Sequence, residues 1–221
     1  MADLKDFIFY EDKKLNITIY CGDSFEILPL INKVDLVICD PPYGLNLGYD
    51  VYDDTEENWD KMFVKLIPEL KRVSTMSVLP CCRMAKLPFI YSVAPPEWII
   101  CWYKGSCGYR AAIGFNDWEP LLVYGKNEGV QMHDYFFAKP DTSDRSYKEH
   151  PCPKPVTWAK WLLSRCMGKV KNGVVLDPFL GSGTTLVAAK ELGVAGIGIE
   201  MSKRYCQIAV DRLQNAQEPM L

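Results

Sequence analysis

The sequence predicts an α/β fold around a doubly wound sheet that is mostly parallel, with an antiparallel strand and helices on both faces. Two observations lead to this prediction. Short β-branched and apolar runs alternate with segments whose apolar residues recur at helical spacing, the pattern of parallel strands joined by crossover helices. The 221 residues are 48% hydrophobic and 24% charged, which fits one decorated domain and excludes disordered and low-complexity classes.

Two strands and a helix are expected in the N-terminal third. Residues 17–20 are β-branched and aromatic, and the run stops at a Gly-Asp pair. Residues 34–38 form a second apolar run, which Asp40 and two prolines end. Apolar side chains then recur at helical spacing over residues 59–73, behind a group of acids that favours a helix N-terminus.

Strands, a polar segment and further helices are expected in the rest of the chain. Residues 98–103 and 121–124 are expected to be strands that pair antiparallel. Residues 126–149 are polar and rich in turn formers, so a long surface loop is expected there, and such loops are often functional. The remaining expected elements are a helix over residues 155–167, a strand at 173–176, a helix at 184–192 closed by Gly193, a strand at 194–199 and a last helix capped by Ser202.

Composition and charge exclude several functional classes. The 25 Lys and Arg against 28 Asp and Glu leave a net charge of −3, which excludes a histone-like protein but allows a local basic face. Nine cysteines without one C-x-x-C pair, together with only two histidines, do not support a zinc site, so no metal is expected. The cysteines are interpreted as reduced thiols, and the N-terminus has no basic-then-apolar signal. A cytoplasmic protein without membrane contact is therefore expected.

A glycine-rich turn follows the strand at 173–176, where ligands bind in open α/β sheets. Gly181 and Gly183 allow the backbone to approach a ligand closely, although a tight structural turn would explain the pair equally well. Glu200 ends the next strand, 23 residues after Asp177, where a carboxylate can accept hydrogen bonds from ribose hydroxyls. The turn lacks the Gly-Lys-Ser/Thr ending of a phosphate loop, so a nucleoside cofactor without a pyrophosphate is predicted.

A second polar cluster, Asp40-Pro41-Pro42-Tyr43, follows the apolar strand at 34–38. Two prolines that simply stop a strand are the alternative explanation. An exocyclic amine of adenine or cytosine is a poor nucleophile because its lone pair is delocalised into the ring. The Asp40 carboxylate and the Pro41 carbonyl can both accept hydrogen bonds from that amine and favour a pyramidal nitrogen, while Pro42 stiffens the backbone. Tyr43 offers a flat face for stacking a base removed from its helix.

The two clusters together resemble the motifs of the S-adenosylmethionine-dependent DNA amino-methyltransferases. The catalytic tetrapeptide comes first and the glycine-rich turn begins 137 residues later, an order similar to the circularly permuted beta class of these enzymes. The resemblance covers nearly the whole chain. It implies a Rossmann-like methyltransferase sheet, a single domain over residues 1–221 and a short target-recognition insert at about 126–149.

The resemblance also implies cofactor contacts outside the turn. Asp23 matches the family's acid at the end of the strand before the catalytic one, which contacts the adenine of the cofactor. Residues 150–155 resemble the family's His-Pro-Thr-Gln-Lys-Pro segment beside the methionine end of the cofactor. Cys152 and Pro153 replace Thr and Gln there, which puts one side-chain hydrogen bond in doubt, whereas Lys154 matches. The expected S-adenosyl-L-methionine-binding residues are Asp23, Lys154, Asp177, Pro178, Phe179, Gly181, Ser182, Gly183, Thr184 and Glu200.

The expected reaction moves a methyl group to N6 of an adenine flipped out of double-stranded DNA. Asp at the first motif position favours adenine in this family, with N4 of cytosine as the alternative. RNA as the acceptor and a catalytically idle DNA-binding or specificity subunit are less favoured. So is a nicotinamide dehydrogenase, because the third glycine of Gly-x-Gly-x-x-Gly is missing.

Few residues are left for reading the DNA sequence. The insert is short, so either a short recognition site or a homodimer is expected, and the residues do not reveal whether a restriction endonuclease is a partner. Acids crowd residues 50–60 and would repel a phosphate backbone unless they face away, which is expected. The expected phosphate contacts are Lys104, Arg110, Lys139, Arg145 and Lys148.

Overall fold

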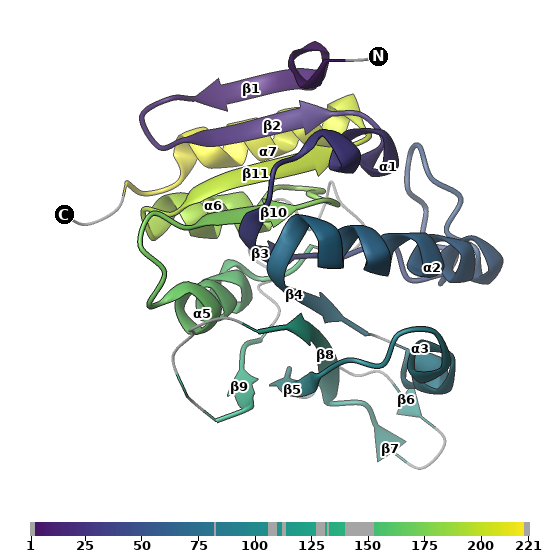
Figure 1. Ribbon diagram of the computed structural model, residues 1–221. Coiled ribbons are helices and arrows are strands. Elements are labelled where there is room, and N and C mark those ends of the chain that lie inside the picture. The colour runs from purple at the N-terminus through teal and green to yellow at the C-terminus, as the bar shows by residue number, and fades with distance from the viewer. Residues whose placement is uncertain are drawn as a thin grey trace.

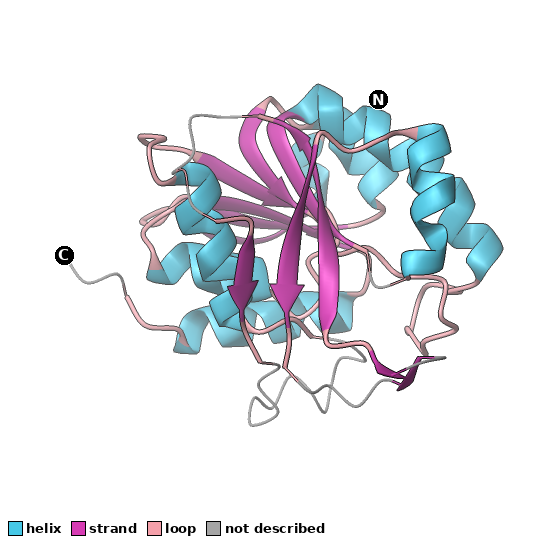
Figure 2. Ribbon diagram, turned by 90° about the horizontal axis from the view of Figure 1, so that it is seen from below, coloured by secondary structure: helices cyan, strands magenta, loops and turns pink. Residues whose placement is uncertain are grey.

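The computed structural model describes residues 3–81, 83–105, 110–111, 114–126, 131, 133–139 and 153–218. Within these residues a nine-stranded sheet runs through the molecule, with helices on both faces (Figures 1 and 2). This arrangement confirms the predicted fold class. The strands lie in the order β1 (Ile8–Asp12), β2 (Ile17–Cys21), β11 (Ala195–Glu200), β10 (Val174–Asp177), β3 (Val34–Ile38), β4 (Ser74–Pro80), β8 (Trp118–Gly125), β5 (Trp98–Tyr103) and β9 (Tyr135–Phe137).

Five neighbouring strands form the parallel centre of the sheet. β2, β11, β10, β3 and β4 pair in parallel, so their carboxyl ends lie at one edge. β1 and β8 run antiparallel to this group, and β5 pairs antiparallel with β8 as expected. The glycine-rich turn follows β10 and the Asp-Pro-Pro-Tyr motif follows β3, which are adjacent strands. The sheet therefore brings the two motifs together from distant parts of the chain.

Helices cover the two faces of the sheet because successive strand residues point to opposite sides. On β3, Val37 belongs to the core cluster that includes the buried side of α2 (Glu56–Val73), whereas Leu36 and Ile38 pack with α5 (Val156–Met167). The shorter helices α1 (Ser24–Ile27) and α3 (Leu87–Val93) lie on the α2 side, and α6 (Thr184–Glu191) and α7 (Lys203–Asn215) on the α5 side (Figure 1). A separate ribbon pairs β6 (Arg110–Ala111) with β7 (Gly114–Phe115), and 3₁₀ turns lie at Leu4–Phe7, Leu28–Leu30 and Met84–Lys86.

Two elements differ from the expectation in ways that local residues explain. α2 begins at Glu56, three residues before the predicted helix, because the Thr55 side chain accepts a hydrogen bond from the backbone of Asn58 and caps it. β4 was not predicted at all. It follows α2 without an intervening turn, and its polar Ser-Thr-Met-Ser start hides the buried half at residues 77–80.

Part of the predicted surface loop is in fact a strand. Residues 135–137 form β9, which pairs in parallel with β5 and extends the sheet at its edge. Phe136 is buried and stacks on Trp161, so burial of one aromatic side chain overrides the polar character of the surrounding segment. Residues 127–130, 132 and 140–152 lie outside the described residues, including Arg145, Lys148 and Cys152.

The described cysteines are free thiols, and four of them are buried in the core: Cys39, Cys81, Cys166 and Cys206. Burial raises the pKa of Cys81 to about 11 and that of Cys166 to about 12, so these groups are uncharged thiols that pack as small apolar side chains. Among the described helices, none combines the length and the apolar character needed to cross a membrane.

Candidate active site

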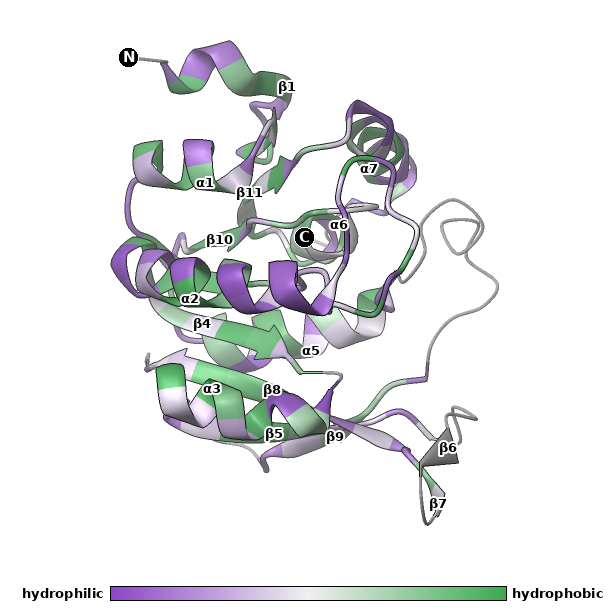
Figure 3. Cartoon of the chain, turned by 90° about the vertical axis from the view of Figure 1, so that its right-hand side faces the viewer, coloured by the Kyte–Doolittle hydropathy of each residue, from purple (hydrophilic) through white to green (hydrophobic). Residues whose placement is uncertain are grey.

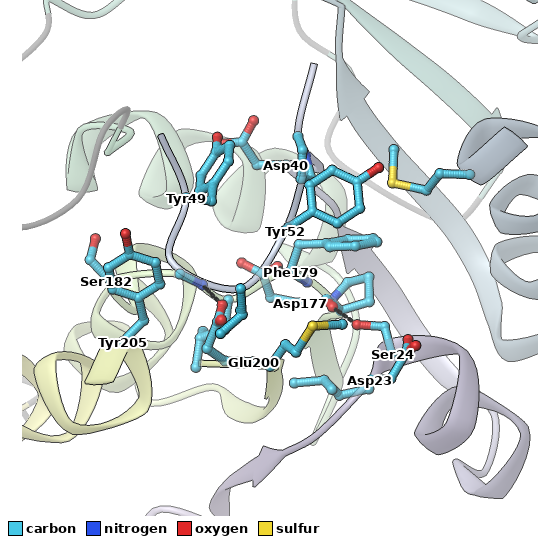
Figure 4. A pocket seen from close by; sticks show the side chains of 18 of the residues that line it. Asp23, Ser24, Asp40, Tyr49, Tyr52, Asp177, Phe179, Ser182, Glu200 and Tyr205 are labelled. Carbon is cyan, nitrogen blue, oxygen red and sulfur yellow. Dashed lines mark hydrogen bonds between the residues drawn. The ribbon is translucent and has the colours of Figure 1, made fainter. Parts of the chain in front are cut away.

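A cavity of about 480 Å³ opens at the carboxyl edge of the parallel strands (Figure 4). The ends of β2, β3, β10 and β11 contribute to its walls, together with α2 and the loop that joins β3 to α2. Most of the side chains expected from the sequence line it, whereas Pro41, Tyr43 and Gly183 do not. The expected residues that line the cavity are Asp23, Asp40, Pro42, Lys154, Asp177, Pro178, Phe179, Gly181, Ser182, Thr184 and Glu200.

The glycine-rich turn adopts a backbone that only glycine takes without strain. Gly181 and Gly183 have φ angles of 53° and 88°, in the left-handed region. Glu200 fastens the turn from the neighbouring strand, because its carboxylate accepts the backbone N–H of Gly181 and that of Ser202, each at 2.8 Å. Gly183 then caps α6, so the turn and the first residue of that helix, Thr184, form one wall of the cavity.

Asp23 lies across the cavity from this turn. Its carboxylate caps α1 by accepting the backbone N–H of Phe25 at 2.8 Å. The adjacent hydroxyl of Ser24 donates to the carbonyl of Pro178, which ties α1 to the residue that follows β10 (Figure 4). Asp23 is thus held at the wall of the same cavity as Asp177 and Phe179.

Two carboxylates of the cavity, those of Asp177 and Glu200, have raised pKa values. Burial raises the pKa of Asp177 to about 7, although hydrogen bonds from Thr185 and from the backbone of Phe179 favour its charged form. The neighbouring carboxylates of Asp40 and Glu200 raise this pKa further. Burial also raises the pKa of Glu200. A cationic ligand would relieve this crowding of acids, so the cavity favours positive charge.

The raised pKa of Asp177 predicts a pH-dependent stability. The folded chain binds this proton more tightly than the unfolded chain, where the ordinary value is 3.8. The contribution of Asp177 is therefore fully present below about pH 4 and is lost as the pH rises to about 7, by roughly 4 kcal/mol in all. Urea unfolding of the wild type and Asp177→Asn should show their difference in unfolding free energy falling over this window. A constant difference between pH 4 and pH 7 would contradict the assignment.

The Asp-Pro-Pro-Tyr motif is arranged differently from the expectation at one residue. Tyr43 was expected to offer an open face for a base, but its side chain is buried, with 5% of its surface exposed. Its hydroxyl donates to the Asp40 carboxylate and accepts a hydrogen bond from the Lys154 ammonium at 2.9 Å. The same ammonium lies 2.9 Å from Asp40 and 4.8 Å from the centre of the Tyr43 ring. Lys154, expected beside the cofactor, lines the cavity and contacts two residues of the Asp-Pro-Pro-Tyr motif.

The loop between the motif and α2 forms one rim of the cavity, and we call residues 44–54 the rim loop. Asp54 holds the start of this loop in place. It is only 2% exposed, and its carboxylate accepts the backbone N–H of Gly44 at 2.6 Å. It also accepts the amides of Leu45 and Leu47, each at 3.1 Å. Further along the loop, Asp50 accepts a hydrogen bond from the Ser202 hydroxyl at 2.6 Å. Figure 3 shows the loop extending from α2 towards α7.

These contacts explain two of the acids that crowd the sequence after the motif. They were expected to face away from a phosphate backbone; Asp50 lines the cavity and Asp54 is enclosed by its own loop. The Asp54 contacts were missed because a run of acids gives no signal of which one is buried. Local contacts of an aspartate side chain with the backbone reach about two to four residues along the chain, so the contact of Asp54 with Gly44, ten residues away, leaves no local signal in the sequence.

Replacing Asp54 with alanine should destabilise the protein by about 3 kcal/mol, because the buried N–H of Gly44 and the partly buried N–H groups of Leu45 and Leu47 would lose a charged acceptor. Chemical unfolding by urea measures this loss. Asp53→Ala is the matched control, since the neighbouring side chain is exposed and changes the charge equally. Equal stability of the two variants would show that the Asp54 contacts do not hold the loop.

Comparison with known proteins assigns this arrangement to a family. A family model described as DNA methylase matches residues 98–211, just over half of the chain. The type II methyltransferase M.ScaI of Streptomyces caespitosus is 42% identical, over 97% of this chain and 87% of its own length. The chain belongs to the N6/N4 DNA amino-methyltransferases.

Solved structures agree with this assignment. The M1.HpyAVI–SAM complex superposes on the methyltransferase with a TM-score of 0.67 and 27% identity, covering 89% of this chain and 98% of that one. The cytosine-N4-specific PvuII DNA methyltransferase shares the fold alone, with a TM-score of 0.66 and 15% identity over 89% of this chain and 86% of that one. Family membership confirms S-adenosylmethionine as the cofactor and DNA as the substrate, but it does not distinguish adenine from cytosine.

Proposed function

We propose that the methyltransferase modifies N6 of adenine in double-stranded DNA, with Asp40 and the Pro41 carbonyl receiving the exocyclic amine. The observation that carries this proposal is the position of Asp40. It lines the same cavity as Asp177 and Glu200, and its charge influences the pKa of Asp177. An amine bound at Asp40 would therefore lie beside the cofactor site.

The catalytic motif would work by positioning. The Asp40 carboxylate would accept one N–H of the amine and the Pro41 carbonyl the other, which turns the nitrogen lone pair away from the ring. Pro41 and Pro42 restrict the backbone before the base arrives, so less entropy is lost on binding. The amine becomes strongly acidic once it is methylated, so Asp40 need not be a strong base.

Tyr43 is proposed as the stacking surface for the flipped base, a contact worth about 1–3 kcal/mol. Because its ring is buried against Lys154, this role requires the side chain to turn outward when DNA binds. This refines the expectation from the sequence: the Tyr43 ring would become exposed for stacking only when DNA binds, and it is not exposed beforehand.

The residues of the cavity fit S-adenosylmethionine, which supplies the methyl group when it is bound. We propose that Glu200 accepts the ribose hydroxyls and that Asp23 and Phe179 contact the adenine. Gly181 has no side chain and lines the cavity, so the backbone of the turn could approach the ligand closely. The carboxylates of Asp23, Asp40, Asp177 and Glu200 suit a ligand that carries a sulfonium cation.

The proposal is tested by expressing the chain in a host without DNA methylation and digesting its genomic DNA to nucleosides. Mass spectrometry should then detect N6-methyladenine with the wild type and none with Asp40→Ala. N4-methylcytosine would retain the mechanism and overturn the choice of base. Purified protein that binds S-adenosylmethionine but leaves this DNA unmodified would overturn the proposal.

The organisation of the chain beyond the site is also a proposal. The order of the motifs along the sequence supports the circularly permuted beta class, in a single domain over residues 1–221 with a target-recognition insert at about 126–149. A homodimer would supplement the few base contacts that such an insert can make. The type II relatives suggest a restriction endonuclease as a partner in a bacterial cytoplasm.

A further inference from the structure

One buried ammonium group connects the two halves of the proposed active site. The Lys154 side chain is only 7% exposed, and its nitrogen lies 2.9 Å from the Asp40 carboxylate and 2.9 Å from the Tyr43 hydroxyl. Tyr43 lies 111 positions before Lys154 in the sequence and Asp40 lies further away, so the sheet and not the local chain brings the three residues together. Lys154 contacts both side chains that the proposed reaction uses.

The backbone of Lys154 is fixed on the cofactor side. Its carbonyl accepts a hydrogen bond from the Thr184 hydroxyl at 3.0 Å, and Thr184 is the first residue of α6 after the glycine-rich turn. Arg212 of α7 donates to the same hydroxyl at 3.2 Å and to the Ser182 carbonyl at 2.7 Å. A continuous series of polar contacts therefore leads from the cofactor turn through Lys154 to the catalytic motif.

Stability alone does not account for such a group. Burying an ion pair gains little over packing apolar side chains of the same volume, because both charges lose their hydration. The pair does fix a geometry, since Asp40 and Tyr43 must both lie within reach of one nitrogen. A reaction that depends on positioning requires the acceptor of the amine to be held in a fixed geometry.

We propose that Lys154 is a positioning residue of the catalytic motif, which holds Asp40 and Tyr43 in register with the cofactor turn, and that it is not a ligand of the cofactor. This inference rests on the proposed function of Asp40 and Tyr43. It replaces the role of Lys154 that the family resemblance implies, which is contact with the methionine end of the cofactor. When Tyr43 turns outward to meet a base, Lys154 keeps its contact with Asp40 and orients the carboxylate.

Lys154→Met tests the two roles against each other in the full-length chain. The single-turnover rate of methyl transfer to unmethylated genomic DNA, at saturating cofactor, should fall about 100-fold. The dissociation constant of S-adenosylmethionine, measured by calorimetry, should stay within about 3-fold of the wild type. Lys154→Arg, which can still donate to both partners, should recover most of the rate.

The matched control is Lys190→Met. Lys190 is also a buried lysine, with its side chain 8% exposed, but it donates to the Leu213 carbonyl on the far side of α6 from the motif. Its loss should lower stability and leave the rate unchanged. If Lys154→Met does not fold, Lys154→Gln replaces it in the comparison of rate with affinity, and Lys154→Arg remains the rescue variant.

Two results would overturn the inference. A rise of 10-fold or more in the dissociation constant would make Lys154 a cofactor ligand, and an unchanged rate in Lys154→Met would remove its positioning role. Failure of the proposed function is distinguishable, because the wild type would then either transfer no methyl group to DNA or methylate cytosine. In that case the cofactor affinity of Lys154→Met still decides between the two roles.

Discussion

Replacing Asp40 with alanine should lower the rate of methyl transfer at least about 1000-fold while the affinity for S-adenosylmethionine stays within a few-fold. The substitution removes the proposed charged acceptor of the amine, and the loss of one well-placed hydrogen-bonding group at a reacting centre typically lowers a rate 100- to 1000-fold. The loss should be larger here because the Lys154 ammonium would be left without its carboxylate. Transfer of labelled methyl groups to DNA, with calorimetry for the cofactor, separates the two effects.

Two companion variants make the result specific. Asp40→Asn keeps the shape of the side chain and one acceptor oxygen, so its rate should lie between those of Asp40→Ala and the wild type. Asp211→Ala removes an exposed acid on α7, where the carboxylate contacts only Gln207 among the described contacts, and should change nothing. A rate for Asp40→Ala within 10-fold of the wild type would move the acceptor role to another residue.

Gly183→Ala should have the largest effect on the fold of the cofactor site. An added Cβ would lie 2.8 Å from the Cβ of Ala209 and 3.0 Å from its Cα, at a residue whose φ is +88°. Left-handed strain costs about 1–2 kcal/mol and overpacking about 1–3 kcal/mol, so we expect a loss of about 2–5 kcal/mol in unfolding free energy. The N-terminus of α6 would move away from α7, and cofactor affinity should fall at least 10-fold.

Gly114→Ala is the control for this substitution. Nothing lies within 4 Å of an added Cβ there, and the residue belongs to the separate β6–β7 ribbon. Thermal unfolding in the presence and absence of S-adenosylmethionine should show a lower melting temperature and a smaller cofactor-induced shift only for Gly183→Ala. Equal melting temperatures for the two variants would mean that α6 and α7 adjust without strain.

The sequence predicted the parts of this enzyme that depend on local pattern. Alternating runs located β3, β10 and β11, and the residues that follow these strands lie in one cavity because parallel strands end at one edge. The fold class, the family and the cofactor were therefore predictable. The strand β4 was hidden because it follows a helix directly, and β9 because its neighbours are polar.

The interior of the site was less accessible to sequence reasoning. Whether Tyr43 faces a cavity or lies buried depends on Lys154, which is remote in sequence and reaches it only through the sheet. Which acid of the rim loop is enclosed depends on where the backbone amides of residues 44–47 point. The burial of Tyr43 and the enclosure of Asp54 both result from three-dimensional packing, so the pattern of residues along the sequence does not predict them.

The rim loop connects the Asp-Pro-Pro-Tyr motif with the Ser202 side of the cavity, which suggests an order of events in turnover. Asp50 of the loop accepts a hydrogen bond from Ser202 beside the cavity, and the loop begins at Gly44, immediately after Tyr43. Exchange of the spent cofactor past this rim would move the segment next to Tyr43, the proposed stacking surface for the flipped base. We therefore expect DNA to leave before the cofactor is exchanged, so that each binding event on DNA yields a single methyl group and the enzyme acts distributively along the duplex.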